Sequence, residues 1–447
     1  MIPKRKRIAI IGSGIAGLSA AWLLSKNHDV TIFESDDRLG GHTNTINVDT
    51  AEGTCAVDTG FIVYNPPNYP NLVALFEHLN VPVKPAKMGF STSLGSAAYE
   101  YSGSGLTGFF GQPKNVFNFS HWCLLKDLLR FFNSAGDRIQ DLNDDISMGE
   151  FLAQGKYSKS FIHNHLLPMA AAIWSSPTTD MLDYPAKAFI RFFDNHGLLK
   201  LINRSPWMTV DGGAKTYVDR LCADGSFSVE LGQRVTSIRR GLDMVAIETS
   251  TSRAIFDDVV LAVHADQAVS VINEPSARER ELLGAFSYAD NLAVVHSDIQ
   301  FMPRRENIWS SWNYIERSDS KKNVPLVSYW MNCLQSLPIK RNIFVTLNPD
   351  APVRPDHHIA KFQYQHPMFD ARALAAQKQL WELQGNGNIW FCGSYFGAGF
   401  HEDALQSGLA VAEELGGVLR PWKLKASSSN NRIYLPLRAT PRPLKAI

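Results

Sequence analysis

The segment RIAIIGSGIAG, residues 7–17, precedes a run of helix-forming residues and then VTIFE, residues 30–34. Its short apolar start is typical of a buried parallel strand, and Gly12, Gly14 and Gly17 then form a GxGxxG pattern. The first glycine permits a tight turn, the second lets a pyrophosphate approach the backbone, and the third lets helix and strand pack closely. This order of strand, glycine loop, helix and strand predicts a dinucleotide-binding βαβ unit.

An acid at the end of the second strand supports the same site. Glu34 lies 22 residues after Gly12, near the spacing of about 20 at which an acid meets ribose hydroxyl groups. The phosphates would lie at the N-terminus of the first helix, where free amides and the helix dipole favour negative charge. We therefore include Ser13, Ile15 and Ala16 in the predicted cofactor site, and Ser35 beside Glu34.

Two further glycine-rich segments favour FAD over a nicotinamide cofactor. SDDRLGGH, residues 35–42, contains Arg38, which can meet a phosphate, and the pair Gly40 and Gly41, which lets the backbone pass close to a bulky group. FCGSYFGAGFHEDALQSG, residues 391–408, places glycines before a helix whose N-terminal amides would stabilise an electron-rich ring. An ordinary glycine-rich connection is the alternative for this last segment.

The order of the elements predicts a discontinuous cofactor domain. Strand-like runs recur after residue 225 and near residue 389, whereas residues 115–204 are rich in helix-forming and aromatic residues. We predict an α/β fold, in which a Rossmann-like FAD-binding domain carries an inserted α+β substrate domain. The expected boundaries are residues 1–70 with 205–285 and 385–420 for the first domain, 71–204 with 286–384 for the second, and 421–447 for a basic tail.

The composition is that of a globular protein and argues against nucleic-acid binding through overall basicity. The 447 residues carry 44 Lys and Arg against 43 Asp and Glu, a net charge of +1. The five cysteines lack CxxC spacing, so neither a disulfide framework nor a metal site is predicted. No apolar run reaches the roughly 18 residues that span a bilayer. We expect a cytoplasmic protein without a signal peptide, and contact with a membrane surface stays open.

Together these segments resemble the flavin-containing amine oxidase superfamily, which includes monoamine and polyamine oxidases, protoporphyrinogen oxidase and carotenoid desaturases. The resemblance runs from GSGIAGLSAAWLL to GFHEDALQSGLAVAEEL. It implies FAD, held by the residues already named. No cysteine or histidine is compellingly placed for a covalent link, so non-covalent FAD is expected. The resemblance adds Val235, whose backbone would meet adenine. Near the flavin ring and pyrophosphate it adds Gly393, Glu402, Asp403 and Ala404.

A narrower resemblance points to lipids. The segments AAAIWSSP, FFDNHGLL, MPRRENIWSSWNYIE and VSYWMNCLQSL look like bacterial NAD/FAD-binding oxidoreductases whose genes accompany cyclopropane-fatty-acyl-phospholipid synthases. Related flavoproteins are implicated in desaturating methylated acyl chains on the way to furan fatty acids. The resemblance therefore implies a lipid substrate and a lipid methyltransferase as partner.

Two departures from the amine oxidase pattern concern the flavin environment. His42 stands where amine oxidases commonly have Arg after the paired glycines, and Phe400 stands where many have an aromatic-cage Tyr. No equivalent was found of the lysine that approaches the flavin through water. A phenylalanine cage without obvious carboxylates suits an apolar substrate better than a cationic one.

Five residues are candidates for the chemistry itself. His42 and His401 adjoin the two flavin segments, and each contacts the flavin or makes a structural hydrogen bond. Tyr395 and Phe400 flank the second flavin loop and are expected beside the ring. His296 ends an alternating run where such folds contact substrate, although a hydrogen-bonded core histidine is the alternative.

The sequence leaves three functions open. The first is dehydrogenation or desaturation of a lipid acyl chain, the second is amine oxidation to an imine with release of peroxide, and the third is an FAD-binding accessory role beside a lipid methyltransferase. VFNFSHWCLLKDLLRFF, residues 116–132, is either a core helix of the inserted domain or a helix that leans on a bilayer. The acid-free tail would add attraction to anionic lipid or form a solvated terminus.

Overall fold

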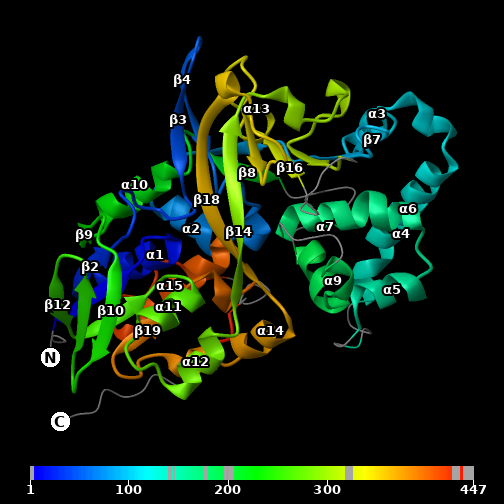
Figure 1. Cartoon of the computed structure of the whole chain (residues 1–447). Helices are drawn as coiled ribbons and strands as arrows, with labels where there is room; N and C mark the ends of the chain where they lie inside the picture. Colours follow the sequence, from blue (N-terminus) through cyan, green and yellow to red (C-terminus); the bar gives the residue numbers. More distant parts are fainter. Residues whose placement is uncertain are drawn as a thin grey trace.

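A five-stranded parallel sheet forms the base of the molecule. Its order is β19-β13-β1-β2-β9, and its strands are β1 (Arg7–Ile11), β2 (Asp29–Phe33), β9 (Ser228–Glu230), β13 (Asp258–Leu261) and β19 (Ile389–Phe391). They come from the N-terminal, middle and C-terminal parts of the chain (Figure 1). The computed structural model describes residues 5–138, 143, 146–174, 180–195, 199, 206–317, 326–424 and 433–435.

Both faces of this sheet are buried, which explains the unbroken apolar run of β1. Ile8 and Ile10 pack against one layer, whose helices are α1 (Ile15–Leu24), α2 (Pro70–His78), α10 (Lys215–Asp224) and α15 (His401–Leu415). Ala9 and Ile11 pack against the other layer, which consists of β10 (Val235–Arg240), β11 (Val245–Thr249), β12 (Arg253–Phe256), α11 (Ala265–Val271), α12 (Ala277–Leu283) and α14 (Ala371–Gln377).

A second, seven-stranded sheet stands beside the first (Figure 1). Its order is β18-β14-β17-β16-β15-β6-β7, with β6 (Phe90–Leu94), β7 (Tyr99–Ser102), β14 (Ser287–His296), β15 (Trp312–Ile315), β16 (Leu326–Trp330), β17 (Phe344–Leu347) and β18 (His358–Met368). Neighbouring strands are antiparallel except β15 and β6. Two shorter antiparallel pairs join β3 (Thr45–Thr50) to β4 (Gly53–Asp58) and β5 (Val83–Ala86) to β8 (Trp207–Val210).

A helical lobe lies beside the seven-stranded sheet (Figure 1). It contains α4 (Phe119–Arg138), α5 (Met148–Gln154), α6 (Lys159–Phe161), the π-helical turn η4 (Ile162–Leu166), α7 (Leu167–Trp174), α8 (Asp180–Asp183) and α9 (Ala186–Asn195). Ala171 and Ala172 of α7 pack on Phe90 and Tyr314 of the sheet. Within the described ranges no helix is both long enough and apolar enough to cross a bilayer.

The predicted fold class is confirmed, because strands from three distant segments complete one parallel sheet and the intervening chain builds a second, mixed region. The expected domain boundaries stay a prediction. The long strand β18 is not predicted by the sequence pattern, since its apolar residues do not alternate cleanly. Residues 425–432 and 436–447, most of the predicted basic tail, lie outside the described residues.

The carboxylate of Asp58 joins three parts of this architecture. It accepts hydrogen bonds from the Ala214 amide at 2.9 Å, the Thr45 hydroxyl at 2.5 Å and the Gln335 amide group at 2.7 Å. Ala214 precedes α10 of the cofactor region, whereas Gln335 follows the short helix α13 (Met331–Leu334), which adjoins the seven-stranded sheet. This buried side chain therefore links the region of the five-stranded sheet to the region of the seven-stranded sheet.

We expect Asp58→Asn to change the pH dependence of stability. Burial raises the pKa of Asp58 from 3.8 to about 7, so between these values the unfolded chain has lost a proton that the folded chain keeps. The stability that this group contributes is complete below the lower value and falls as the pH rises toward the upper one. Because Asn does not titrate, the wild type should lose stability relative to the variant over this interval.

Urea unfolding of the wild type and the variant at about pH 5 and about pH 8 measures this difference. Asp219→Asn is the control, because the Asp219 side chain lies on the exposed side of α10, 58% accessible. A difference in unfolding free energy that is the same at both pH values would contradict the assignment.

Candidate functional site

The predicted phosphate loop has the geometry of an anion site. Gly12 has a φ of +99°, and a Cβ at Gly17 would lie 2.0 Å from the Gly12 carbonyl oxygen, so both positions require glycine. The first hydrogen bond of α1 runs from the Leu18 amide to the Gly14 oxygen. The amides of Ile15, Ala16 and Gly17 precede that bond and stand at the positive end of the helix dipole.

The second glycine segment lies directly against this loop. The Gly40 amide donates to the Ser13 carbonyl at 3.0 Å, and a Cβ at Gly41 would lie 3.2 Å from the Gly14 Cα. Gly40 and Gly41 have φ values of +111° and +57°. The Arg38 side chain is partly exposed and contacts the Thr43 carbonyl at 3.4 Å. Two segments predicted separately from the sequence are therefore adjacent.

Glu34 lies at the rim of the same loop. Its carboxylate accepts from the Ser13 amide at 2.8 Å and, on its other oxygen, from the Asp36 amide at 3.0 Å and the Ser35 hydroxyl at 3.2 Å. The Gln233 amide donates to the Glu34 carbonyl, which brings Val235, buried at the start of β10, to this edge of the sheet. The residues expected around adenosine are thus gathered at one place.

The second flavin segment reaches this loop through α15. A Cβ at Gly408 would lie 2.1 Å from the Ala16 carbonyl oxygen, so α15 and α1 cross in backbone contact. Gly393, at the end of β19, donates its amide to the Ser407 hydroxyl of α15 at 2.9 Å. Ala404, in the first turn of α15, is 8% exposed. This packing carries the GFHED segment toward the phosphate loop.

His401 is held by aromatic residues from two other elements. Its ring stacks on Phe61 with centroids 3.9 Å apart and planes 9° apart. Its Nε2 atom lies 2.8 Å from the Tyr217 hydroxyl, which is 2.5 Å from the Thr43 hydroxyl. Burial lowers the pKa of His401 to about 3. The imidazole is therefore uncharged at neutral pH.

His42 belongs to a cluster of buried rings. Its centroid lies 5.0 Å from Tyr364, 5.5 Å from His366 and 6.5 Å from His264. Burial, and then the neighbouring His366, lower the pKa of His42 to about 3. Burial also lowers the pKa of His366, to about 4, and that of His264. Three neutral imidazoles therefore adjoin the paired glycines.

The two acids of the GFHED segment serve the backbone. Glu402 accepts from the amides of Asn71 at 2.9 Å and Leu72 at 3.0 Å, and from the Asn71 side chain at 2.8 Å, which holds the first turn of α2. Asp403 accepts from the Phe400 amide at 2.9 Å and closes the first turn of α15. The predicted cofactor contact of Glu402 and Asp403 stays a prediction.

The remaining catalytic candidates lie in different surroundings. Phe400 is partly exposed at the start of α15, whereas Tyr395 is 1% exposed and packs on Phe286 and Phe396 in the cluster under β19. His366 pairs with Ala289 near the start of β14, whereas His296 is the last residue of that strand. At about 3.3 Å per residue, Ala289 and His296 are about 20 Å apart. His296 bonds the Thr346 hydroxyl at 2.6 Å and the Asp298 amide at 3.0 Å. The structure does not bring His296 to the other candidates.

Several site residues escape the sequence analysis: Asp58, Phe61, Tyr217, His264 and His366. Asp58 ends β4 directly before Thr59 and Gly60, and an acid at a strand end is the one local signal among them. The others become neighbours only through tertiary packing. No group of three or more His, Cys, Asp or Glu side chains in the described part of the chain is arranged to hold a metal ion.

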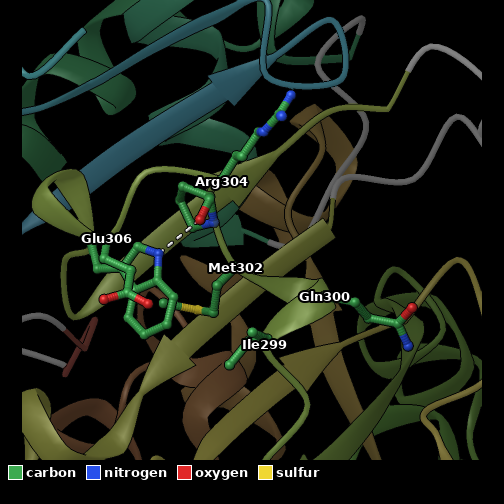
Figure 2. Close-up of a pocket in the computed structure, with 7 residues that line it drawn as sticks. Ile299, Gln300, Met302, Arg304 and Glu306 are labelled. Atoms are coloured by element: carbon green, nitrogen blue, oxygen red, sulfur yellow. Dashed lines mark hydrogen bonds between the residues drawn. The ribbon is translucent and has the colours of Figure 1, made fainter.

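A surface pocket lies beyond the His296 end of β14. It has a volume of about 330 Å³ and is bounded by η5 (Ile299–Phe301) and η6 (Glu306–Ile308). Figure 2 shows the Arg304 side chain pointing away from Ile299 and Met302. The indole of Trp309 donates a hydrogen bond to the Pro303 carbonyl at 2.7 Å. This pocket is separate from the glycine segments and the histidine cluster.

The gathered residues fit FAD. A Cβ added at Gly14 would have no atom of another described residue within 4 Å, so the loop leaves open space where a pyrophosphate would approach. The free amides of α1 supply donors for phosphate oxygens. Among the described residues, the buried Nε2 atom of His42 has no hydrogen-bond partner, so it is available to a bound group. These features define a dinucleotide-binding protein whose site fits FAD. It has the architecture of a flavin oxidoreductase, in which a cofactor-binding region is joined to a second, mixed α and β region.

Comparison with known proteins identifies the family. The model of the family described as "Flavin containing amine oxidoreductase" matches residues 15–338, and the chain therefore belongs to that family, whose cofactor in this fold is FAD. The chain is 49% identical to the L-amino-acid oxidase of Pseudechis australis over 41 residues, 9% of this chain and 8% of that one. It is 24% identical over 276 residues to AofH of Mycobacterium tuberculosis, a candidate flavin-containing monoamine oxidase, covering 60% of this chain and 59% of that one. The matches thus span less than two thirds of these relatives.

Solved structures share the fold over almost the whole chain. A fatty acid isomerase from P. acnes that produces CLA has a TM-score of 0.63 at 18% identity, covering 93% of this chain and all of that one, 100%. Putrescine oxidase with bound putrescine has a TM-score of 0.65 at 15% identity, covering 92% and 99%. At these identities the likeness establishes the fold and leaves the substrate to the site itself.

We expect Gly14→Val to abolish FAD binding without unfolding the chain. Gly14 has a φ of −63° and a ψ of 175°, which any residue adopts, and its Cβ direction is open. The added methyl groups would occupy the space of the pyrophosphate. Visible absorption of the purified variant should be lost while its far-ultraviolet circular dichroism stays native.

Gly103→Ala is the matched control, because a Cβ there meets only the Phe90 carbonyl at 3.7 Å. This control should stay yellow. A yellow Gly14→Val protein would show that the cofactor does not pass over this glycine.

Glu402→Gln tests the structural role of the buried acid. The glutamine keeps the shape but replaces one acceptor by a donor that faces the amides of Asn71 and Leu72. An unsatisfied buried group costs about 1–3 kcal/mol, so the free energy of unfolding should fall by that amount. Chemical unfolding measures the loss, with Glu414→Gln, at an exposed position near the other end of α15, as the comparison. A variant with native stability and no flavin would instead assign Glu402 to the cofactor.

Proposed function

We propose that the chain is an FAD-dependent oxidoreductase that dehydrogenates a lipid acyl chain. The observation that carries this proposal is that the buried imidazoles of the candidate site are uncharged. His42, His366 and His401 are neutral, because burial lowers the pKa of each to about 4 or below. The carboxylates of Glu402 and Asp403 are directed at backbone amides.

An uncharged, aromatic environment favours an apolar substrate over an ammonium ion. A cation that enters a buried site without an anionic partner loses its hydration without compensation. The buried carboxyl group of Asp58 is hydrogen-bonded to the Ala214 amide and the Gln335 side chain. The fold shared with a fatty acid isomerase and the narrower resemblance to lipid-associated oxidoreductases support the same choice.

The reaction removes two hydrogens from adjacent carbons and leaves a double bond. When bound, FAD supplies an acceptor for a hydride, the second hydrogen leaves as a proton, and dioxygen or another acceptor restores the cofactor. In this proposal Phe400 and Phe61 exclude water from the acyl chain, and His42 Nε2 holds a polar atom of the cofactor. A pKa of about 3 makes His42 a weak proton acceptor, so we assign it positioning rather than base catalysis.

Anaerobic reduction tests the proposal. The holoprotein is mixed without oxygen with phospholipids that carry monounsaturated or methyl-branched acyl chains. We expect loss of the visible flavin absorption and a lipid product that lacks two hydrogen atoms by mass spectrometry. Gly14→Val protein, which should bind no FAD, is the negative control. An unchanged flavin spectrum with every lipid would contradict the proposal.

Amine oxidation is the second candidate, because the chain belongs to a family described by that activity. It predicts peroxide release with a member of a broad amine panel that includes putrescine. A flavin that is bleached by an amine and not by lipid would select this function. The accessory role beside a lipid methyltransferase requires no turnover, and biological function that survives Glu34→Arg would favour it.

A further inference from the structure

Helix α4 is apolar on two opposite faces. On its buried face, Phe131 and Ala135 pack into the helical lobe and Leu124 packs on Tyr101 and Phe109, and each of the three helix residues is 0% exposed. Its other face exposes Phe119 by 80%, Trp122 by 46% and Leu129 by 40%. A helix that packs on one side only is normally polar on the other. The second apolar face of α4 therefore needs a partner.

Neighbouring segments extend this face into one surface. Leu106 in α3 (Gly105–Phe109) is 72% exposed, and Val116 and Phe117 in η2 (Pro113–Phe117) are 43% and 91% exposed. We call the six residues the apolar ridge: Leu106, Val116, Phe117, Phe119, Trp122 and Leu129. Every exposed Phe and Trp side chain among the described residues belongs to this ridge. So much exposed aromatic surface in one place marks an interaction site.

Hydrogen bonds and ring contacts hold the elements of the apolar ridge together. The Trp122 indole donates to the Val116 carbonyl at 2.8 Å, and its ring lies 5.0 Å from that of Phe110. Beneath it, the two ring nitrogens of His121 contact the Tyr99 hydroxyl at 2.6 Å and the Phe109 carbonyl at 3.0 Å. These contacts fix α3, η2 and α4 relative to one another, and Figure 1 shows α3 and α4 at the edge of the molecule away from β9 and β12.

The charges around the ridge are positive. Lys114 and Lys126 are exposed beside the aromatic side chains. The one acid between residues 101 and 135 is Asp127, which is 6% exposed, lies 3.0 Å from Arg130 and accepts from the Ser158 amide. The adjacent residues 304–306 add no net positive charge, because Arg305 pairs with the buried Glu100 carboxylate and Glu306 offsets Arg304.

We propose that the apolar ridge docks on an anionic lipid bilayer. Phe117, Phe119 and Trp122 would enter the interface, and Lys114 and Lys126 would meet lipid phosphates. A second copy of the chain fits less well, because two ridges face to face would oppose their lysines. The proposal concerns binding alone and holds whichever substrate the flavin site takes.

Vesicle binding tests the ridge. The holoprotein is sedimented with vesicles of phosphatidylcholine alone and of phosphatidylcholine mixed with phosphatidylglycerol. We expect binding to the mixed vesicles that weakens as salt is raised. Phe117→Ser with Phe119→Ser should reduce the affinity roughly tenfold or more, and Lys114→Glu with Lys126→Glu should remove the preference for phosphatidylglycerol.

Leu242→Ser with Met244→Ser is the matched control. These two side chains are 101% and 47% exposed in the turn between β10 and β11, at the opposite side of the molecule in Figure 1. All variants should keep the flavin spectrum, which establishes that they fold. Equal binding by the ridge variant and the wild type, or an equal loss in the control, would overturn the proposal. A dimer that dissociates in the ridge variant, with no vesicle binding by either protein, would assign the ridge to self-association instead.

Discussion

Backbone contact at glycine is the constraint on which the site depends. Gly17 lies against the Gly12 carbonyl, Gly41 against the Gly14 Cα, and Gly408 against the Ala16 carbonyl. A Cβ would clash at Gly17 and Gly408 and would be crowded at Gly41, and together these contacts bring the second glycine segment and α15 to the first turn of α1. The helix N-terminus, the second glycine segment and α15 then share one space, and that space is where a dinucleotide binds in this fold.

Buried acids keep these segments in place, and hydrogen bonds from protein groups occupy their carboxylate oxygens. Glu402 joins α15 to α2, and Asp58 joins α10 to the region of the seven-stranded sheet. A carboxylate that accepts two or three amide hydrogen bonds satisfies its lone pairs within the protein. What surrounds His42 and His401 is a set of aromatic rings and neutral imidazoles. The low charge of the site therefore follows from how the fold is fastened, and it does not require a loss of acidic residues from the sequence.

Local requirements were predictable from the sequence and distant pairings were not. The spacing of Gly12, Gly14, Gly17 and Glu34 reports a backbone geometry that adjacent residues create, so the loop and the acid at its rim were placed together correctly. In the ring cluster at His42, His264 and His366 come from segments more than 200 residues away in the sequence. The strand β18, which carries His366, has no clear alternation of apolar residues that would predict it. Glu402 shows the same limit, because its position beside the flavin segment was readable and its bonds to Asn71 and Leu72 were not.

His296 illustrates why a strand pattern alone does not locate chemistry. It ends a row of buried polar side chains that crosses the seven-stranded sheet, in which Ser91 donates to Asn313 at 2.7 Å and Ser328 lies 2.7 Å from Thr346. Thr346 in turn contacts His296, so each member of the row has a partner in a neighbouring strand. Such a row satisfies buried polar groups and aligns five strands at one end of the sheet.

The strand that ends at His296, β14, carries Tyr288 at its other end, where the ring stacks on His264 with centroids 4.2 Å apart. Because one strand serves structure at one end and the candidate site at the other, alternation predicts the strand but only the tertiary fold decides which end meets the cofactor.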